Sequence, residues 1–189
     1  MQRLAFYDPL TLLPNRRLFS DRTSQALALS ERNSIFGMLL VIDLDNFKAL
    51  NDNHGHTIGD LLLQETALRI VKSVRETDTV CRYGGDEFVV VIYPLTSDLH
   101  DSTMNAQSIA RKILLTVSEP FTLQSKHHLD NPVQHSCTVS IGGILFFGNK
   151  TLEDQLFFEA DKAMYRSKEL GRNQIRFANP IFEEQIKSA

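Results

Sequence analysis

Two short acidic segments are the residues of this sequence best suited to chemistry. Asp43-Leu44-Asp45 follows the apolar run 38–42, and Asp86-Glu87 follows a pair of glycines. Carboxylates are hard oxygen ligands, and a small number of them suits Mg²⁺ shared with the phosphates of a substrate. Two such ions can activate an attacking hydroxyl and hold a phosphoryl group in place. The segments therefore predict metal-assisted phosphate chemistry, provided that the fold brings them together.

Three predicted strands are needed to bring these carboxylates together. The apolar run 38–42 predicts a strand buried on both faces, which Asp43 ends. Residues 79–83 and 87–92 resemble strands joined by a two-residue turn, Gly84-Gly85. In a ferredoxin-like sheet the first strand is antiparallel to the third, so Asp43, Asp86 and Glu87 should meet at one end. Two like charges about 4 Å apart repel by roughly 4 kcal/mol at an effective dielectric of ~20, a conflict that a divalent cation would remove.

Each of these features also has a purely structural explanation. Asp43 and Asp45 are good caps for a following helix, and Asp86 suits a β-turn. Any tight hairpin favours Gly84 and Gly85, although a glycine also lets a nucleotide approach the turn closely. The residues alone leave these alternatives open.

The remaining elements complete an α+β pattern. Helices are expected at 16–32 with Asn15 as N-cap, at 46–53 before a loop at 53–56, from 60 to 74, around 106–117, and at 152–167 before Gly171. A hairpin is expected from 121–126 and 133–144 through Asp130-Asn131-Pro132, with a closing strand at 174–177. This order predicts an elaborated ferredoxin-like fold of the palm or nucleotidyl-cyclase type, with a mostly antiparallel sheet flanked by helices.

Length and charge exclude several classes of protein. The 189 residues fit a single domain, 1–189, with 178–189 as a C-terminal tail or linker. Twenty Lys and Arg against 23 Asp and Glu give a net charge of −3, which argues against a palm acting on nucleic acid. The longest apolar run, Ile35 to Ile42, is too short to cross a bilayer. Cys81 and Cys137 are far apart and outside any metal motif, which indicates reduced thiols in a cytoplasmic domain.

The sequence resembles the GGDEF domain of diguanylate cyclases from about Asp8 to Phe177. Gly84-Gly85-Asp86-Glu87-Phe88 spells the signature of that family. Further motifs match the family in chain order before and after it: Asp8–Arg16, Asp43–Lys48, Asn51-Asp52, Gly55-His56, Gly59-Asp60, Val139–Gly142, Ala160–Tyr165, Lys168 and Gly171-Arg172-Asn173. Leu12 stands where the family usually has glycine, a difference expected to be minor. We expect regulatory modules, and any membrane attachment, to lie in flanking regions.

The resemblance implies a specific reaction. Members of the family condense two GTP molecules into cyclic di-GMP and release two pyrophosphates. Each domain of a homodimer binds one GTP, and the 3′-hydroxyl of each GTP attacks the α-phosphate of the other. The resemblance also implies Mg²⁺ or Mn²⁺, two ions for each GTP. The protein then contributes positioning and charge stabilisation.

The resemblance also implies roles for individual residues. The Asp43 carboxylate, the Leu44 main-chain carbonyl and Asp86 would hold metal, while Glu87 would be a further ligand or help to deprotonate the 3′-hydroxyl. Asp86 and Glu87 are thus the catalytic candidates. The residues expected to bind GTP are Phe47, Lys48, Asn51, Asp60, Gly84, Gly85, Lys168 and Arg172.

Within that set, Asn51 and Asp60 would bind the guanine edge, and Lys48, Lys168 and Arg172 would meet the β- and γ-phosphates. Lys168 and Arg172 are four residues apart and are expected to share one face of a helix end. Basic residues in that place also simply complement a helix dipole.

A second site is indicated by Arg75-Glu76-Thr77-Asp78, which resembles the family's RxxD inhibitory motif at the family's spacing from Gly84. By resemblance, Arg75 and Asp78 would bind a guanine of the product, cyclic di-GMP, although an ordinary ion pair at a helix end has the same pattern. The alternative function is a catalytically silent GTP-binding module of a larger GGDEF-EAL signalling protein. In such modules the signature has usually decayed, whereas Asp43, Asp86 and Glu87 are all present here.

Overall fold

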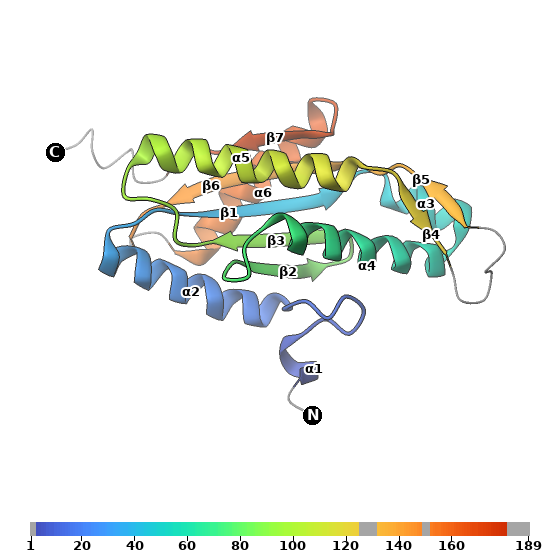
Figure 1. Ribbon diagram of the computed structural model, residues 1–189, viewed down its shortest axis with the longest axis horizontal. Coiled ribbons are helices and arrows are strands. Elements are labelled where there is room, and N and C mark those ends of the chain that lie inside the picture. Colours follow the sequence, from blue (N-terminus) through green and yellow to red (C-terminus); the bar gives the residue numbers. More distant parts are fainter. Residues whose placement is uncertain (1–2, 125–131, 149–151, 181–189) are drawn as a thin grey trace.

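A computed structural model describes residues 3–124, 132–148 and 152–180 of the chain (Figure 1). Its helices are α1 (Arg3–Phe6), α2 (Arg16–Asn33), α3 (Phe47–His54), α4 (His56–Ser73), α5 (Leu99–Ser118) and α6 (Glu153–Glu169). Its strands are β1 (Gly37–Leu44), β2 (Thr79–Gly84), β3 (Glu87–Ile92), β4 (Phe121–Leu123), β5 (Val133–His135), β6 (Val139–Phe146) and β7 (Gln174–Phe177).

The main sheet has the strand order β2-β3-β1-β6-β7. The pairs β2–β3, β3–β1 and β1–β6 are antiparallel, and only β6 and β7, which α6 connects, run parallel. Strands β1, β2, β3 and β6, together with α3, α4 and α5, form the β-α-β-β-α-β plan of a ferredoxin-like fold. The predicted α+β fold with a mostly antiparallel sheet is therefore confirmed.

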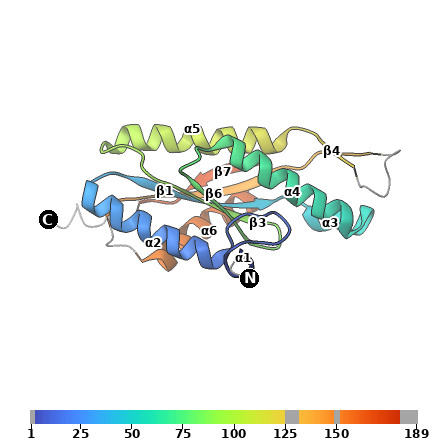
Figure 2. The ribbon, with the colours of Figure 1, turned by 60° about the horizontal axis from the view of Figure 1, so that its bottom comes forward.

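Helices cover both faces of this sheet. Figure 2 shows α4 and α5 on one face and α2 and α6 on the other. Alternate residues of β1 enter the two layers: Leu40 and Ile42 belong to the core under α4 and α5, and Leu39 and Val41 to the core under α2 and α6. Every residue of β1 is buried, which is why its sequence is a continuous apolar run rather than an alternating one.

Two connections are tighter than the sequence predicted. The expected loop 53–56 is wrong, because α3 continues to His54 and α4 begins at His56. Gly55 alone separates them, with a φ of 81° that a residue with a side chain rarely adopts. The β2–β3 turn consists of Gly85 and Asp86 rather than Gly84-Gly85, since β2 includes Gly84 and only Gly85 has a positive φ. Asp86 therefore lies in the turn itself.

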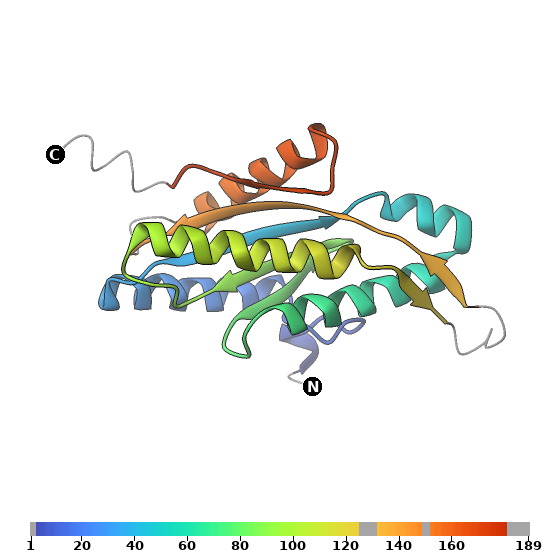
Figure 3. The same cartoon turned by 45° about the horizontal axis from the view of Figure 1, so that its top comes forward.

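The expected hairpin from 121–126 and 133–144 is also wrong in its extent. Only β4 and β5 pair with each other, and they project past the end of the main sheet (Figure 3). The chain then enters the main sheet as β6, which pairs with β1. Two residues of the predicted turn, Asp130 and Asn131, lie outside the described residues.

Both cysteines are buried and unpaired, in agreement with the expected reduced thiols. Burial raises the pKa of each thiol, Cys81 and Cys137, to about 12, so neither is a reactive thiolate at neutral pH. Within the described residues, none of the helices combines the length and the apolar character that a membrane span requires.

The turn before α2 contains a strained residue. Leu12 has a φ of 60° and is 76% exposed, so it adopts a left-handed backbone without burying its side chain. The hydrogen bond from the Leu12 N–H to the Asp8 carbonyl oxygen, 2.9 Å, holds it there. For an L-residue this conformation costs roughly 1–2 kcal/mol, which explains why glycine suits the position.

Leu12→Gly is expected to stabilise the protein. Relief of the left-handed conformation outweighs the greater entropy of glycine in the unfolded chain, roughly 0.4–1 kcal/mol, and leaves a gain of about 0.5–1 kcal/mol. Urea unfolding would measure it as a higher midpoint. The matched control is Leu115→Gly, since Leu115 is 58% exposed but lies within α5 in right-handed helical backbone, where glycine should cost about 1 kcal/mol. A lower midpoint for Leu12→Gly would contradict the strain.

Candidate active site

Three carboxylate residues lie at one end of the sheet, as the topology predicted. Asp43 and Glu87 are directly opposite each other in the β1–β3 ladder. Asp86 precedes Glu87, and its main-chain carbonyl accepts a hydrogen bond from the Leu44 N–H at 3.3 Å. The side chain of Asp43 is almost fully buried, whereas those of Asp86 and Glu87 are partly exposed.

The charges at this sheet end oppose one another. Burial is the largest cause that raises the pKa of Glu87, and the negative charges of Asp43, Asp161 and Asp86 raise it further. Burial likewise raises the pKa of Asp43, with added repulsion from Asp86 and Asp45. Asp161, on α6, is a member of this acidic group that the sequence reasoning did not select. Its place in the Ala160–Tyr165 motif was the available signal.

Lys168 supplies the opposing charge. Its Nζ lies 2.7 Å from Oδ2 of Asp43, in an ion pair whose lysine side chain is 30% exposed and whose aspartate side chain is 7% exposed. Lys168 is in the last turn of α6, so this helix places a cation over the end of β1. The prediction that Arg172 shares a helix face with Lys168 is wrong, because α6 ends at Glu169 and Arg172 lies in the following turn with a φ of 64°.

The donor set fits a divalent cation that binds together with a phosphate ligand. Among the described residues, no three His, Cys, Asp or Glu side chains come together closely enough to hold a metal ion unaided. Mg²⁺ characteristically uses one or two carboxylates together with substrate phosphates and water. Asp43 has the chemistry of such a ligand, because it is buried and repelled by Asp86. Among the ion pairs of the described residues, only the one with Lys168 compensates its negative charge.

The residues predicted to bind guanine lie on the two helices that Gly55 separates, α3 and α4. Asn51 is on α3, and Asp60 is exposed on α4, next to Gly59. A Cβ on Gly59 would lie 1.9 Å from Asn51 Oδ1, so this glycine is what allows Asn51 to approach α4. Asn51 Oδ1 is buried and has no hydrogen-bond partner. A buried polar atom left unsatisfied is unusual and calls for an explanation.

The first residues of α3 divide between core and surface. Phe47 is partly buried and packs against the core, while Lys48 is exposed on the first turn. The helix begins directly after Asn46, which caps it without a side-chain hydrogen bond. Its first N–H groups are thus available to an anion, together with the Lys48 ammonium.

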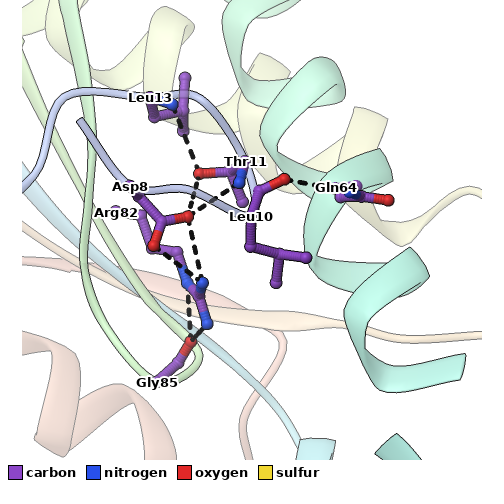
Figure 4. Close-up of polar contacts among 7 residues, drawn as sticks. All are labelled: Asp8, Leu10, Thr11, Leu13, Gln64, Arg82 and Gly85. Carbon is purple, nitrogen blue, oxygen red and sulfur yellow. Dashed lines mark hydrogen bonds and ion pairs between the residues drawn. The ribbon is translucent and has the colours of Figure 1, made fainter. Parts of the chain in front are cut away.

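Arg82, on β2, links the signature turn to the N-terminal segment (Figure 4). The guanidinium of Arg82 donates to both carboxylate oxygens of Asp8, each at 3.1 Å, and twice to the Gly85 carbonyl oxygen, at 3.1 and 2.8 Å. Asp8 also accepts from the Thr11 N–H and hydroxyl. Burial raises the pKa of Asp8, but the hydrogen bonds from Thr11 and Arg82 together outweigh burial, so the pKa is lowered. The sequence reasoning placed Asp8 in a motif but missed Arg82.

Beside this turn is an open hollow of about 760 Å³. Gly84 and Gly85 line it together with residues from the starts of α2 and α6. A Cβ built on either glycine would meet nothing within 4 Å. Crowding inside the domain therefore gives no reason for glycine at these two positions.

Arg75 and Asp78 lie in the connection from α4 to β2, at the opposite end of this strand from the signature turn. The Arg75 N–H donates to Asp78 Oδ2 at 2.9 Å, and burial raises the pKa of the Asp78 carboxyl. Both residues line a groove of about 380 Å³, along with Tyr7, Pro14 and Arg22 from the N-terminal turn and α2.

Comparisons with known proteins agree with this geometry. A family model described as "Diguanylate cyclase, GGDEF domain" matches residues 5–174. The chain is 40% identical over 189 residues to the bifunctional diguanylate cyclase/cyclic di-GMP phosphodiesterase MucR of Pseudomonas aeruginosa, covering 98% of this chain and 26% of MucR. It is 39% identical over 176 residues to the response regulator PleD of Caulobacter vibrioides, covering 91% of this chain and 36% of PleD. It thus spans about a quarter to a third of the length of these two relatives.

Solved structures show the same fold. The GGDEF domain of TpbB from Pseudomonas aeruginosa superposes with a TM-score of 0.80 at 34% identity, covering 97% of this chain and 99% of that one. The coiled coil and GGDEF domain of DgcB from Caulobacter crescentus, solved with c-di-GMP, gives a TM-score of 0.79 at 29% identity, covering 94% of this chain and 87% of that one. The sheet, the acidic sheet end and these matches together establish that the chain belongs to the family of diguanylate cyclase GGDEF domains.

Proposed function

We propose that this chain condenses two molecules of GTP into cyclic di-GMP and releases two pyrophosphates, with one GTP bound to each of two copies. The observation that carries the proposal is the position of Asp43, Asp86 and Glu87 at one sheet end, with Lys168 paired to Asp43. Relatives named as diguanylate cyclases support it, as does the complex of DgcB with c-di-GMP.

Asp43, Asp86 and the Leu44 main-chain carbonyl would hold Mg²⁺ or Mn²⁺, two ions for each GTP. The bound cations supply charge stabilisation at the phosphates and make the 3′-hydroxyl more acidic. We assign to Glu87 the removal of the proton from that hydroxyl, with a further contact to metal as its alternative role. Its raised pKa makes it a stronger base than an ordinary carboxylate. The 3′-oxygen then forms a bond to the α-phosphorus of the other GTP, and the bond from that phosphorus to pyrophosphate breaks.

Recognition of guanine is assigned to Asn51 and Asp60. An exposed carboxylate at Asp60 accepts hydrogen bonds from guanine N1–H and its amino group, which adenine does not offer in that pattern. The unsatisfied amide oxygen of Asn51 beside it is explained if the same base supplies its partner.

The triphosphate is assigned to Lys48, Lys168 and Arg172. A phosphate that reaches Lys168 would share this lysine with Asp43, so the ion pair at 2.7 Å preorganises the cation for the ligand. Gly84 and Gly85 leave an open surface over which the nucleotide can pass close to the backbone.

The test is direct. Purified protein at high concentration is incubated with GTP and Mg²⁺, and the products are separated and identified by mass. Cyclic di-GMP and pyrophosphate in a 1:2 ratio support the proposal. Tight GTP binding without product, in an assay where an active cyclase makes it, would instead indicate a silent binding module and overturn the proposal.

Arg75 and Asp78 are assigned to an inhibitory site for the product. The guanidinium of an arginine can donate two hydrogen bonds to the acceptor edge of a guanine, and the Asp78 carboxylate can accept from its donors. The groove that contains them lies at the start of β2, whereas the signature turn follows the other end of that strand, so product bound there leaves the GTP site free.

Arg75→Ala is expected to relieve product inhibition and leave the initial rate within about twofold. Loss of a bidentate contact to guanine costs roughly 1–3 kcal/mol, so the concentration of cyclic di-GMP that halves the rate should rise at least about fivefold. Initial rates at increasing product concentrations measure this. Lys72→Ala, an exposed change on the preceding helix, is the control. Equal inhibition of wild type and Arg75→Ala would remove the assignment.

A further inference from the structure

Asp45 is a buried carboxylate for which the proposed reaction has no use. It is 4% exposed and follows Leu44, and its side chain accepts three hydrogen bonds. Oδ1 accepts from the Ser140 hydroxyl at 2.8 Å, and Oδ2 accepts from the Thr138 hydroxyl at 2.6 Å and from the Asn173 N–H at 3.1 Å. The explanation of Asp45 as a cap for the next helix is therefore wrong.

The turn that Asp45 holds is strained. Gly171, Arg172 and Asn173 have φ angles of 111°, 64° and 46°, so two residues with side chains adopt left-handed backbone in succession. Each such residue costs roughly 1–3 kcal/mol and persists only where its surroundings fix it. The Arg172 N–H donates to the Ser167 carbonyl oxygen at 3.0 Å, and the only side-chain acceptor found for the Asn173 N–H in the described residues is Asp45.

The strained turn carries a residue of the proposed site. Arg172 lies between its two backbone anchors, the bond to Ser167 on one side and the bond from Asn173 to Asp45 on the other. Asp45 lies two residues after Asp43 and next to Leu44, so the same strand end that would hold metal also fixes this turn. Backbone strain maintained in the 171–173 turn indicates that the Arg172 side chain must point in one direction.

We propose that Asp45 is a positioning residue, which fixes the 171–173 turn so that the guanidinium of Arg172 faces the phosphates of bound nucleotide. This inference rests on the proposed function, because Arg172 has no other ligand assigned. It separates the two aspartates of Asp43-Leu44-Asp45 into different tasks: the first faces metal and the second orients a cation.

A double-mutant cycle tests the proposal with 3′-deoxy-GTP and Mg²⁺, since this nucleotide lacks the attacking hydroxyl and is not consumed. Asp45→Ala and Arg172→Ala should each lower its affinity about tenfold. The double variant should also lose about tenfold rather than a hundredfold, because both changes remove the same contact. Ser140→Ala, which removes one bond to Asp45 but leaves the bond from Asn173, should stay within about twofold.

A second measurement needs no nucleotide. Protection of the Asn173 amide from hydrogen exchange should be lost in Asp45→Ala and kept in Ser140→Ala. If Asp45→Ala does not fold, Asp45→Ser replaces it in both experiments, since a side chain one atom shorter does not reach all three donors. Additive losses of affinity in the cycle, or a protected Asn173 amide in the Asp45 variant, would overturn the role of Asp45. Failure of the wild type to bind 3′-deoxy-GTP would overturn the proposed function, and the phosphate role of the turn with it.

Discussion

Asp86→Ala is expected to lower the rate of cyclic di-GMP synthesis by about 10³-fold, or about 4 kcal/mol. The variant removes a carboxylate from the β2–β3 turn, where Asp86 faces Asp43 and Glu87 at the same sheet end. The remaining protein groups have less negative charge with which to hold a cation near the phosphates. Since the hydrogen bond that Asp86 makes to the Leu44 N–H uses its main-chain carbonyl, which alanine keeps, the loss should appear in kcat and not in the free energy of unfolding.

The comparison that makes this result specific is Asp21→Ala. Asp21 is exposed on α2 and accepts a hydrogen bond from Gln25, and it is not among the charges that shift the pKa of Asp43 or Glu87. Its removal changes the net charge equally and should leave the rate within about twofold. Retention of more than about a tenth of the wild-type rate in Asp86→Ala would show that the metal ligands are assigned wrongly.

Arg82→Ala is expected to impair both stability and catalysis. The guanidinium is 15% exposed and joins the Asp8 carboxylate to the Gly85 carbonyl oxygen, so its loss leaves two acceptors without these donors. The free energy of unfolding should fall by about 2–3 kcal/mol, as for a mostly buried ion pair that loses one partner. The rate should fall roughly 10–100-fold, because groups that orient ligand-bearing segments typically contribute that much.

Arg176→Ala provides the control for this prediction. Arg176 is an exposed arginine on β7 whose side chain donates to Gln174, so the same change should leave stability and rate nearly unaltered. Urea unfolding and initial rates at saturating GTP measure the two effects. Wild-type rates in a destabilised Arg82→Ala variant would mean that the turn holds its catalytic geometry without the Arg82 contacts.

The sequence predicted the parts of the site that depend on strand order. Once 38–42 and 87–92 are strands of a ferredoxin-like sheet, antiparallel pairing brings Asp43 opposite Glu87, and no further information is needed. The fully apolar β1 and the asparagine cap of α2, where Asn15 accepts from the Arg17 and Leu18 N–H groups, were equally local signals.

Tertiary contacts decided what the sequence reasoning missed. Arg82 and Asp8 are 74 residues apart, and nothing in their local sequence indicates that they pair. Asp45 looks like a helix cap by position, but the β6 hydroxyl of Ser140 and the distant Asn173 N–H take its carboxylate instead. The shared helix face predicted for Lys168 and Arg172 failed because the left-handed turn at Gly171 ends α6 between them.

The central claim is that two copies of this acidic sheet end act on two GTP molecules together. It is tested most directly by two copies of the chain joined by a flexible linker, with the rate of cyclic di-GMP formation measured at a protein concentration too low for free copies to meet. We expect steady synthesis by the linked pair, little by the single chain, and almost none when one copy carries Asp86→Ala. A linked pair that binds GTP and Mg²⁺ yet makes no cyclic di-GMP would contradict it.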